Sequence, residues 1–140
     1  MKILIAADGS KYTRSMLAYV VAHPELFGPA HDYTVLTAVP GVPPRASVVI
    51  DKKTLHDYYA EEAEKVLAPV RAFCEEKGLS VKTEYKVGPP GETIATAATQ
   101  GKYELIVMGT HGYSTLGKLV MGSVTTNVIA HCGVPVLLVR

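Results

Sequence analysis

The sequence predicts an α/β fold in which a parallel sheet is doubly wound, with helices on both of its faces. Strand patterns alternate strictly with helix patterns, in the order β-α-β-α-β-α-β-α-β. The crossovers are about ten residues or longer, as parallel connections require. A chain of 140 residues suits one hydrophobic core, so we expect residues 1–140 to form a single domain.

Two strands and a helix are predicted at the start of the chain. Lys2–Ala7 is a short apolar run typical of a buried strand. The helix pattern Ser10–His23 follows, with Ser10 suited to the N-cap position. Tyr33–Val39 is rich in β-branched residues, which favour a second strand.

A proline-rich loop and a long helix come next. Three prolines within residues 40–44 are incompatible with a regular ladder or helix. The segment Asp51–Lys77 has the apolar spacing of a helix, with Asp51 suited to cap it and Gly78 to end it.

The second half of the chain repeats the alternation. Leu79–Val87 alternates apolar with charged residues, which predicts a strand with one wet face at a sheet edge. A turn at residues 88–91 leads into the helix Glu92–Gln100. The remaining elements are the strand Tyr103–Met108, the helix Ser123–His131 and the strand Val134–Val139.

Composition excludes several classes of protein. The net charge of +1 gives no broad electrostatic reason to expect binding to nucleic acid or to acidic membranes. The apolar runs are far shorter than the roughly 20 residues needed to cross a bilayer, and the first of them is better read as a strand than as a signal peptide. Cys74 and Cys132 form no metal pattern, so a reduced, cytoplasmic protein is expected.

The stretch Met108–Thr126 has the composition of an anion site. It contains four glycines among small hydroxyl residues, between a predicted strand and a predicted helix. Glycine allows close backbone approach to a ligand, and free amides at a helix start attract phosphate. No Asp or Glu follows Glu104, so a nucleotide phosphate is the first hypothesis for this stretch.

Two familiar nucleotide motifs do not fit. Residues 112–119 nearly match the P-loop, but Leu119 stands where that motif needs a hydroxyl for Mg²⁺, and the motif does not open directly off the strand. The dinucleotide pattern G-x-G-x-x-G does not occur either.

A third pattern matches without a gap. Gly109 and Gly112 are separated by two residues, and nine further residues lead to Gly122-Ser123. This spacing resembles the G-2x-G-9x-G-(S/T) motif of the ATP-binding universal stress proteins. The resemblance covers the whole chain, including the Asp8-Gly9-Ser10 corner and the Val134-Pro135-Val136 ending. It implies a Rossmann-like sheet of order 3-2-1-4-5, as in the adenine nucleotide alpha hydrolase-like folds, a cytoplasmic location, and a homodimer in which the strand Val134–Val139 pairs across the axis.

The resemblance also assigns a nucleotide site. Its residues would be Ala6, Ala7, Asp8, Val39, Met108, Gly109, Thr110, His111, Gly112, Gly122, Ser123, Val124 and Thr125. The glycine backbone would turn toward ribose and phosphates, while the amides of residues 122–125 and the hydroxyls of Ser123 and Thr125 would grip the phosphates. The structural alternatives are a tight turn at the first glycine pair and a simple helix cap at Ser123.

For three of these residues, a purely structural role is the alternative. Asp8 would face ribose or a Mg²⁺ or Mn²⁺ ion held by the phosphates, or it would only form an Asp-Gly turn. Ala6 and Val39 would wall an adenine pocket, with the Val39 backbone reading the base edge, or they would be ordinary strand-end core.

Catalysis is not indicated. Asp8 is the one acid expected near the crevice, and no group is available to orient water beside a γ-phosphate. The leading hypothesis is a module that binds ATP, or ADP or AMP, with the segment Tyr113–Met121 closing on the ligand. A scaffold of the same fold that binds no nucleotide and a slow ATPase are the alternatives.

Overall fold

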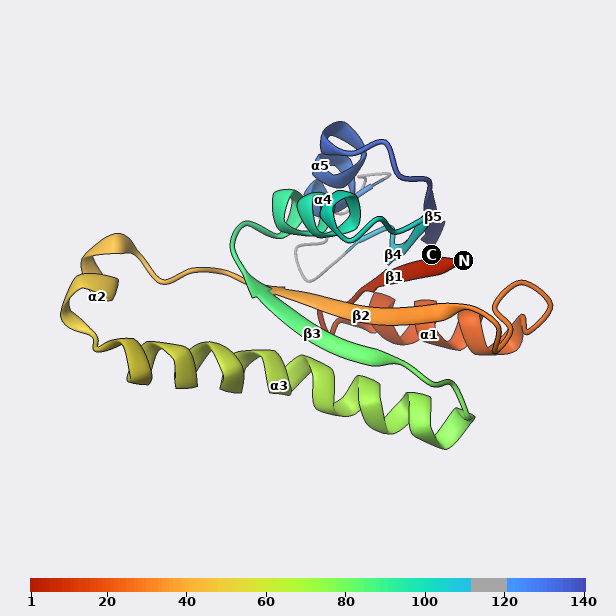
Figure 1. Ribbon diagram of the computed structural model, residues 1–140, viewed down its shortest axis with the longest axis horizontal. Coiled ribbons are helices and arrows are strands. Elements are labelled where there is room, and N and C mark those ends of the chain that lie inside the picture. The colour runs from red at the N-terminus through yellow and green to blue at the C-terminus, as the bar shows by residue number, and fades with distance from the viewer. Residues whose placement is uncertain (112–120) are drawn as a thin grey trace.

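The computed structural model describes residues 1–111 and 121–140. Its strands form one parallel sheet in the order β3-β2-β1-β4-β5 (Figure 1). The strands are β1 (Lys2–Ala6), β2 (Asp32–Val39), β3 (Lys82–Val87), β4 (Leu105–Gly109) and β5 (Val136–Val139). The predicted fold class and strand order are therefore confirmed.

Helices cover both faces of this sheet. In Figure 1, α1 and α3 lie on one side of it and α4 and α5 on the other. The helices are α1 (Lys11–Ala22), α2 (Pro44–Val49), α3 (Lys52–Lys77), α4 (Pro90–Gln100) and α5 (Ser123–His131). No helix in residues 1–111 and 121–140 has both the length and the apolar character that crossing a membrane demands.

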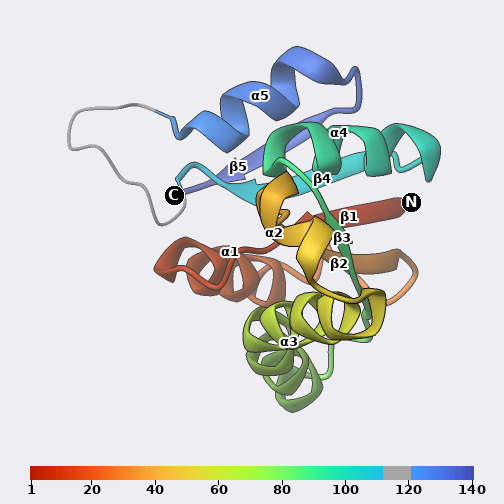
Figure 2. The same ribbon diagram turned by 90° about the vertical axis from the view of Figure 1, so that its left-hand side faces the viewer.

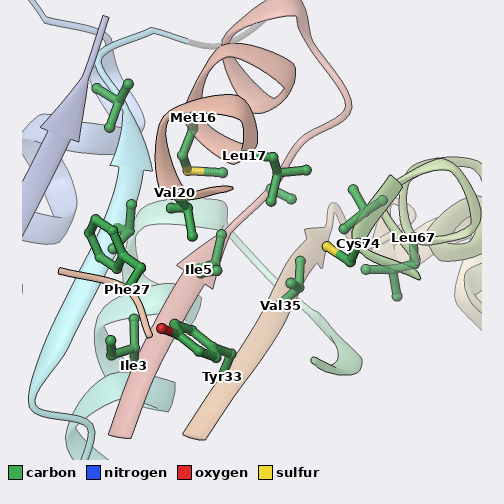
Figure 3. Close-up of a cluster of buried hydrophobic side chains, with 14 of the residues drawn as sticks. Ile3, Ile5, Met16, Leu17, Val20, Phe27, Tyr33, Val35, Leu67 and Cys74 are labelled. Carbon is green, nitrogen blue, oxygen red and sulfur yellow. The ribbon is translucent and has the colours of Figure 1, made fainter. Parts of the chain in front are cut away.

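The sheet separates two hydrophobic clusters, and β1 contributes to both. Ile3 and Ile5 pack into the cluster under α1 and α3, which Figure 3 shows together with Met16 and Cys74. Leu4 and Ala6 point to the opposite face, where α4 and α5 pack. This alternation follows from the two-residue period of a strand. Because both faces of β1 are buried, its sequence reads as a continuous apolar run.

Local signals fix the ends of the helices. Ser10 caps α1, since its Oγ accepts a hydrogen bond from the Tyr12 amide over 3.2 Å. Gly78 ends α3 in the left-handed conformation with φ of 74°, as predicted. Asp51 occupies the N-cap position of α3, but its side chain makes no capping bond. The helix α3 begins there without the predicted cap.

Several element boundaries differ from the predictions. The helix α2 was not predicted, and it begins at Pro44, where a proline is tolerated because the first-turn amide needs no intrahelical partner. For the same reason α4 begins at Pro90 rather than Glu92. Strands β3 and β5 are shorter than expected and begin at Lys82 and Val136. None of these shifts changes the order of the elements.

The sheet order brings two loops together. β1 pairs directly with β4, with Ile3 opposite Leu105. The corner after β1 and the chain after β4 therefore meet at the same edge of the sheet, as expected for a crevice where strand order reverses.

Candidate functional site

A pocket of about 560 Å³ opens at the carboxyl edge of the sheet. Figure 2 views the molecule from this side. The pocket takes residues from the ends of β1, β2 and β4 and from α3, α4 and α5. Eleven of the thirteen residues assigned from the sequence line it: Ala6, Ala7, Asp8, Val39, Met108, Gly109, His111, Gly122, Ser123, Val124 and Thr125.

The other two assigned residues do not line the described pocket. Thr110 is buried, and its carbonyl accepts a hydrogen bond from the Gly122 amide over 2.7 Å. Gly112 lies outside the described residues, as does nearly all of the segment Tyr113–Met121 that was expected to close on a ligand.

Asp8 is held by the corner between β1 and α1. Its Oδ1 accepts hydrogen bonds from the Ser10 amide and from the Thr13 hydroxyl, both over 2.9 Å. Thr13 Oγ1 in turn accepts bonds from the amides of Asp8 and Gly9. The turn-forming role of Asp8 is therefore real. It occupies one carboxylate oxygen, while Oδ2 makes no hydrogen bond to the described residues.

This carboxylate suits a metal ion only when phosphate supplies most of the ligands. The described residues contain no group of three or more His, Cys, Asp or Glu side chains able to hold a metal ion. One free oxygen on Asp8 matches the usual way in which Mg²⁺ is bound, through one or two carboxylates plus the phosphates of a substrate.

The first turn of α5 presents unpaired amides to the pocket. Gly122 is the N-cap, and the first intrahelical bond runs from the Thr126 amide to the Gly122 carbonyl over 3.1 Å. The amides of Ser123, Val124 and Thr125 precede that bond and have no helical acceptor. Ser123 is exposed and does not cap the helix, so the simple capping alternative is wrong.

Two hydrogen bonds fix this helix start to the end of β4. Besides the bond from the Gly122 amide, the Thr125 hydroxyl donates to the Gly109 carbonyl over 3.1 Å. Thr125 is only 2% exposed. Its hydroxyl therefore has a structural role, contrary to the expected role as a phosphate donor, which would require this bond to break.

Gly109 is required by packing. A Cβ at this position would lie 2.9 Å from the Tyr12 Cβ and 3.3 Å from the His111 carbonyl oxygen. Gly109 is the last residue of β4, and its backbone lies at the pocket wall. The tight turn considered as an alternative also involves Gly112, which lies outside the described residues. The His111 ring lies beside it, 5.2 Å from the Tyr12 ring, with Nδ1 at 2.9 Å from the Thr110 hydroxyl.

Part of the pocket wall is apolar. Ala6, Val39 and Met108 are buried and also belong to the two hydrophobic clusters. The Val39 carbonyl accepts a hydrogen bond from the Gly88 amide over 2.9 Å. These residues are therefore both core and pocket wall, and the two readings of them do not exclude each other.

Sequence reasoning missed the contribution of α3 to the pocket. Glu62 and Lys65 line it and form an ion pair of 2.6 Å, and this hydrogen bond raises the pKa of Lys65. The spacing of Glu62, Lys65 and Val66 at i, i+3 and i+4 indicates one helix face, but only the tertiary fold shows which face. The other unassigned lining residues are Thr13, Thr37, Ala38, Pro40, Pro90 and Ile94.

Comparison with known proteins identifies the family. The model of the universal stress protein family matches residues 1–140. A universal stress protein of Thermus aquaticus is 35% identical over 141 residues, which span 99% of this chain and 97% of the relative. Universal stress protein MJ0531 of Methanocaldococcus jannaschii is 31% identical over 143 residues, spanning 99% of this chain and 81% of the relative.

Solved structures of universal stress proteins also resemble this chain. The structure of protein MJ0577 is 30% identical with a TM-score of 0.77, covering 99% of this chain and 94% of that one. Two structures at lower identity share the fold. One is a universal stress protein in complex with cAMP (19%, TM-score 0.71, covering 100% and 97%). The other is the Archaeoglobus fulgidus protein in complex with dAMP (20%, TM-score 0.70, covering 100% and 98%). The match over residues 1–140, the relatives and the fold lead to one conclusion: the chain belongs to the universal stress protein family.

Proposed function

We propose that this chain binds an adenine nucleotide in the pocket at the carboxyl edge of the sheet, and that ATP is the ligand, with ADP or AMP as the alternatives. One observation carries the proposal. The apolar wall, the half-free carboxylate and the unpaired amides of α5 line a single pocket. Its volume of about 560 Å³ lies within the usual range for small-molecule sites.

The three features divide between the parts of a nucleotide. Ala6, Val39 and Met108 offer an apolar slot for the base. The free Oδ2 of Asp8 is available to ribose or to a Mg²⁺ or Mn²⁺ ion on the phosphates. The amides of residues 123–125 are positioned as donors to phosphate, where the helix dipole also favours negative charge. The complexes with cAMP and dAMP formed by proteins of the same fold support a nucleotide of this class.

Binding rather than turnover is the activity that we propose. Among the described lining residues the acids are Asp8 and Glu62. Asp8 is committed to its turn through one oxygen, and Glu62 is paired with Lys65 on α3. Both acids therefore already accept hydrogen bonds, and the second oxygen of Asp8 is the one proposed to face ribose or the metal ion, so neither is assigned to orient water. The protein would then be a nucleotide-dependent switch in the stress response of the cytoplasm, with a slow ATPase as the alternative.

A homodimer through β5 is part of the proposal. The sequence of β5, Val136–Val139, contains no charge, whereas β3 at the other edge exposes Lys82, Glu84 and Lys86. Charged residues on an edge strand oppose pairing with another sheet. The uncharged edge is therefore the one suited to a second copy of the chain.

Nucleotide binding can be tested by thermal unfolding and calorimetry with ATP, ADP, AMP and GTP, each with and without Mg²⁺. A ligand at 100 times its Kd adds about 2.7 kcal/mol to stability. The absence of a shift with every nucleotide would contradict the proposal and favour the scaffold alternative. Phosphate release under multiple turnover, compared with buffer, decides the question of a slow ATPase.

A substitution at the start of α5 tests the phosphate position. Ser123→Glu places a carboxylate where phosphate is proposed, while an acid in a first helical turn stabilises the helix. We expect binding of ATP to be lost without a loss of thermal stability. The matched control is Ser80→Glu, at an exposed residue between α3 and β3, which should leave binding intact. Unchanged affinity in Ser123→Glu would show that the phosphates lie elsewhere.

A further inference from the structure

The short helix α2 has an unusual amount of free apolar surface. None of its residues, Pro44–Val49, is buried. Val48 is 84% exposed and Val49 is 82% exposed, more than any other large apolar side chain in residues 1–111 and 121–140. Surface valines are ordinary one at a time, but two adjacent ones on a helix without any core contact indicate a surface that is covered in another state.

The position of α2 connects this surface with the pocket. In Figure 1, α2 stands beyond the ends at which β2 and β3 terminate, separated from the body of the molecule. Figure 2 views the same side directly and places α2 in front of the central strands, between α3 and α4. The end of β2 and the helices α3 and α4 all contribute residues to the lining of the pocket.

Both attachments of α2 lead to elements that line that pocket. On one side, Pro40 lines the pocket directly after β2. On the other side, α3 contributes Glu62, Lys65 and Val66. Residues 41–51, which we call the α2 arm, therefore connect the strand and the helix that supply two walls of one cavity.

One end of the arm is held by a hydrogen bond, and the other end is an extended connection. At the first end, the Val42 amide donates to the Tyr59 hydroxyl over 3.0 Å. The adjacent Gly41 is exposed, and a Cβ at this position would make ordinary van der Waals contacts, at 3.7 Å from a Val87 side-chain carbon and 3.8 Å from the Tyr59 hydroxyl. At the second end, Ile50 and Asp51 are extended and separate α2 from α3. Hinges are commonly a few residues at the ends of elements.

The chemistry of the arm complements a nucleotide. Arg45, Val48 and Val49 have the i, i+3, i+4 spacing that puts side chains on one helix face. Arg45 is exposed and forms no ion pair with the described residues. Residues 40–50 contain no acid. The face thus combines two apolar side chains, suited to the flat face of a base, with one free guanidinium, suited to an anionic ligand.

We propose that the α2 arm is a lid that closes over the base end of the pocket when nucleotide binds. Closure turns Val48 and Val49 onto the base and brings Arg45 toward the anionic end of the ligand. This inference rests on the proposed function, because the lid needs a nucleotide to close on. It adds residues from the arm to the site, and it explains why α2 buries nothing in the open structure.

Calorimetry with AMP as the probe tests the lid. The double variant Val48→Ser/Val49→Ser removes apolar surface that makes no core contact, so we expect an unchanged melting temperature. If the valines cover the base, AMP should bind about tenfold more weakly, since partial burial of two valines is worth roughly that factor. Hydrogen exchange at residues 46–50 of the unsubstituted protein should slow when AMP is added. The matched control is Leu26→Ser, which removes a side chain that is 53% exposed and lies outside the pocket.

The results of these experiments distinguish failure of the lid proposal from failure of the proposed nucleotide binding. Normal AMP affinity in the double variant, together with unchanged exchange in the arm on AMP binding, would overturn the lid and leave the proposed function standing. Failure of the unsubstituted protein to bind AMP and ATP would overturn both. Hydrogen exchange in the arm could instead slow as the protein concentration rises, independently of AMP, while analytical ultracentrifugation shows a dimer forming. That result would assign the valines to a contact with a second copy and would also overturn the lid.

Discussion

The glycine at position 109 shows how a single residue serves packing and binding together. Its missing side chain lets α1 approach β4, because a Cβ would meet the Tyr12 Cβ at 2.9 Å. Its carbonyl also accepts the Thr125 hydroxyl, which orients the start of α5. The glycine that a motif search assigns to the ligand is therefore needed by the protein fold itself.

Gly109→Ala should destabilise the protein by about 1–3 kcal/mol, the usual effect of overpacking a tight contact. Urea denaturation measures this change. The control is Gly133→Ala, where a Cβ would have no neighbour within 4 Å, and we expect little change there. Equal stability of the two variants would mean that Tyr12 moves aside to accommodate the added methyl group without a measurable loss of stability.

The edge strands illustrate how one element determines assembly. Backbone groups of β5 alternate in direction, since the Ile106 amide donates to the Pro135 carbonyl and the Thr110 amide to the Val139 carbonyl. In a parallel pair, a residue bonds to the two neighbours of the residue opposite it. Ile106 lies opposite Val136, so the amide of Val136 itself points away from β4. That outward amide is available to a second chain.

Val136→Pro should abolish the proposed dimer while leaving the β4–β5 ladder in place, because the amide that proline removes faces outward, and the ring replaces a side chain that is only half-buried against the cluster under α4 and α5. Light scattering after size-exclusion chromatography gives the mass. The matched control is Val87→Pro on β3: the Gly88 amide bonds to the Val39 carbonyl, so the Val87 amide also faces outward. A dimer that survives Val136→Pro but is lost in Val87→Pro would place the interface at the other edge.

Stability as a function of pH is a property of the whole molecule that two buried groups should control. Burial raises the pKa of the Cys74 thiol above its ordinary value of 9.0 and the pKa of the Tyr33 hydroxyl above 10.0. The folded state thus retains protons that the unfolded chain releases. The stabilisation is complete below the unfolded pKa values and is lost as the pH rises through them.

Urea denaturation between pH 7 and 11 should therefore show stability that is level near neutrality and falls above about pH 9. The slope from each group is at most about 1.4 kcal/mol per pH unit. Cys74→Ala and Tyr33→Phe should each flatten part of the decline, whereas Tyr58→Phe at an exposed position serves as the control. An identical decline in all variants would assign alkaline unfolding to other groups.

The fold and the list of pocket residues were largely predictable from the sequence, because both depend on local signals. β1 reads as a buried strand since both of its faces carry apolar residues, and the spacing from Gly109 to Ser123 is visible without coordinates. The hydrogen-bond partner of Thr125 and the pocket position of Glu62 and Lys65 depend on which elements meet in space. The helix α2 was missed because prolines usually disrupt a helix. At the first turn of a helix, where Pro44 stands, proline is instead well tolerated.

The fixed corner around Asp8 has a consequence for the change in heat capacity on ligand binding. Because Ser10 and Thr13 already hold Oδ1 of that carboxylate, a ligand meets a group whose conformational freedom has been removed during folding. The ribose and phosphate end of the site is then preorganised, and most of the ordering on binding falls to the α2 arm. Apolar burial gives a negative change in heat capacity. In a calorimetric temperature series, the part of the heat-capacity change that is lost in Val48→Ser/Val49→Ser would be the contribution of the arm, and inorganic pyrophosphate, which lacks a base, would bind with almost no change in heat capacity.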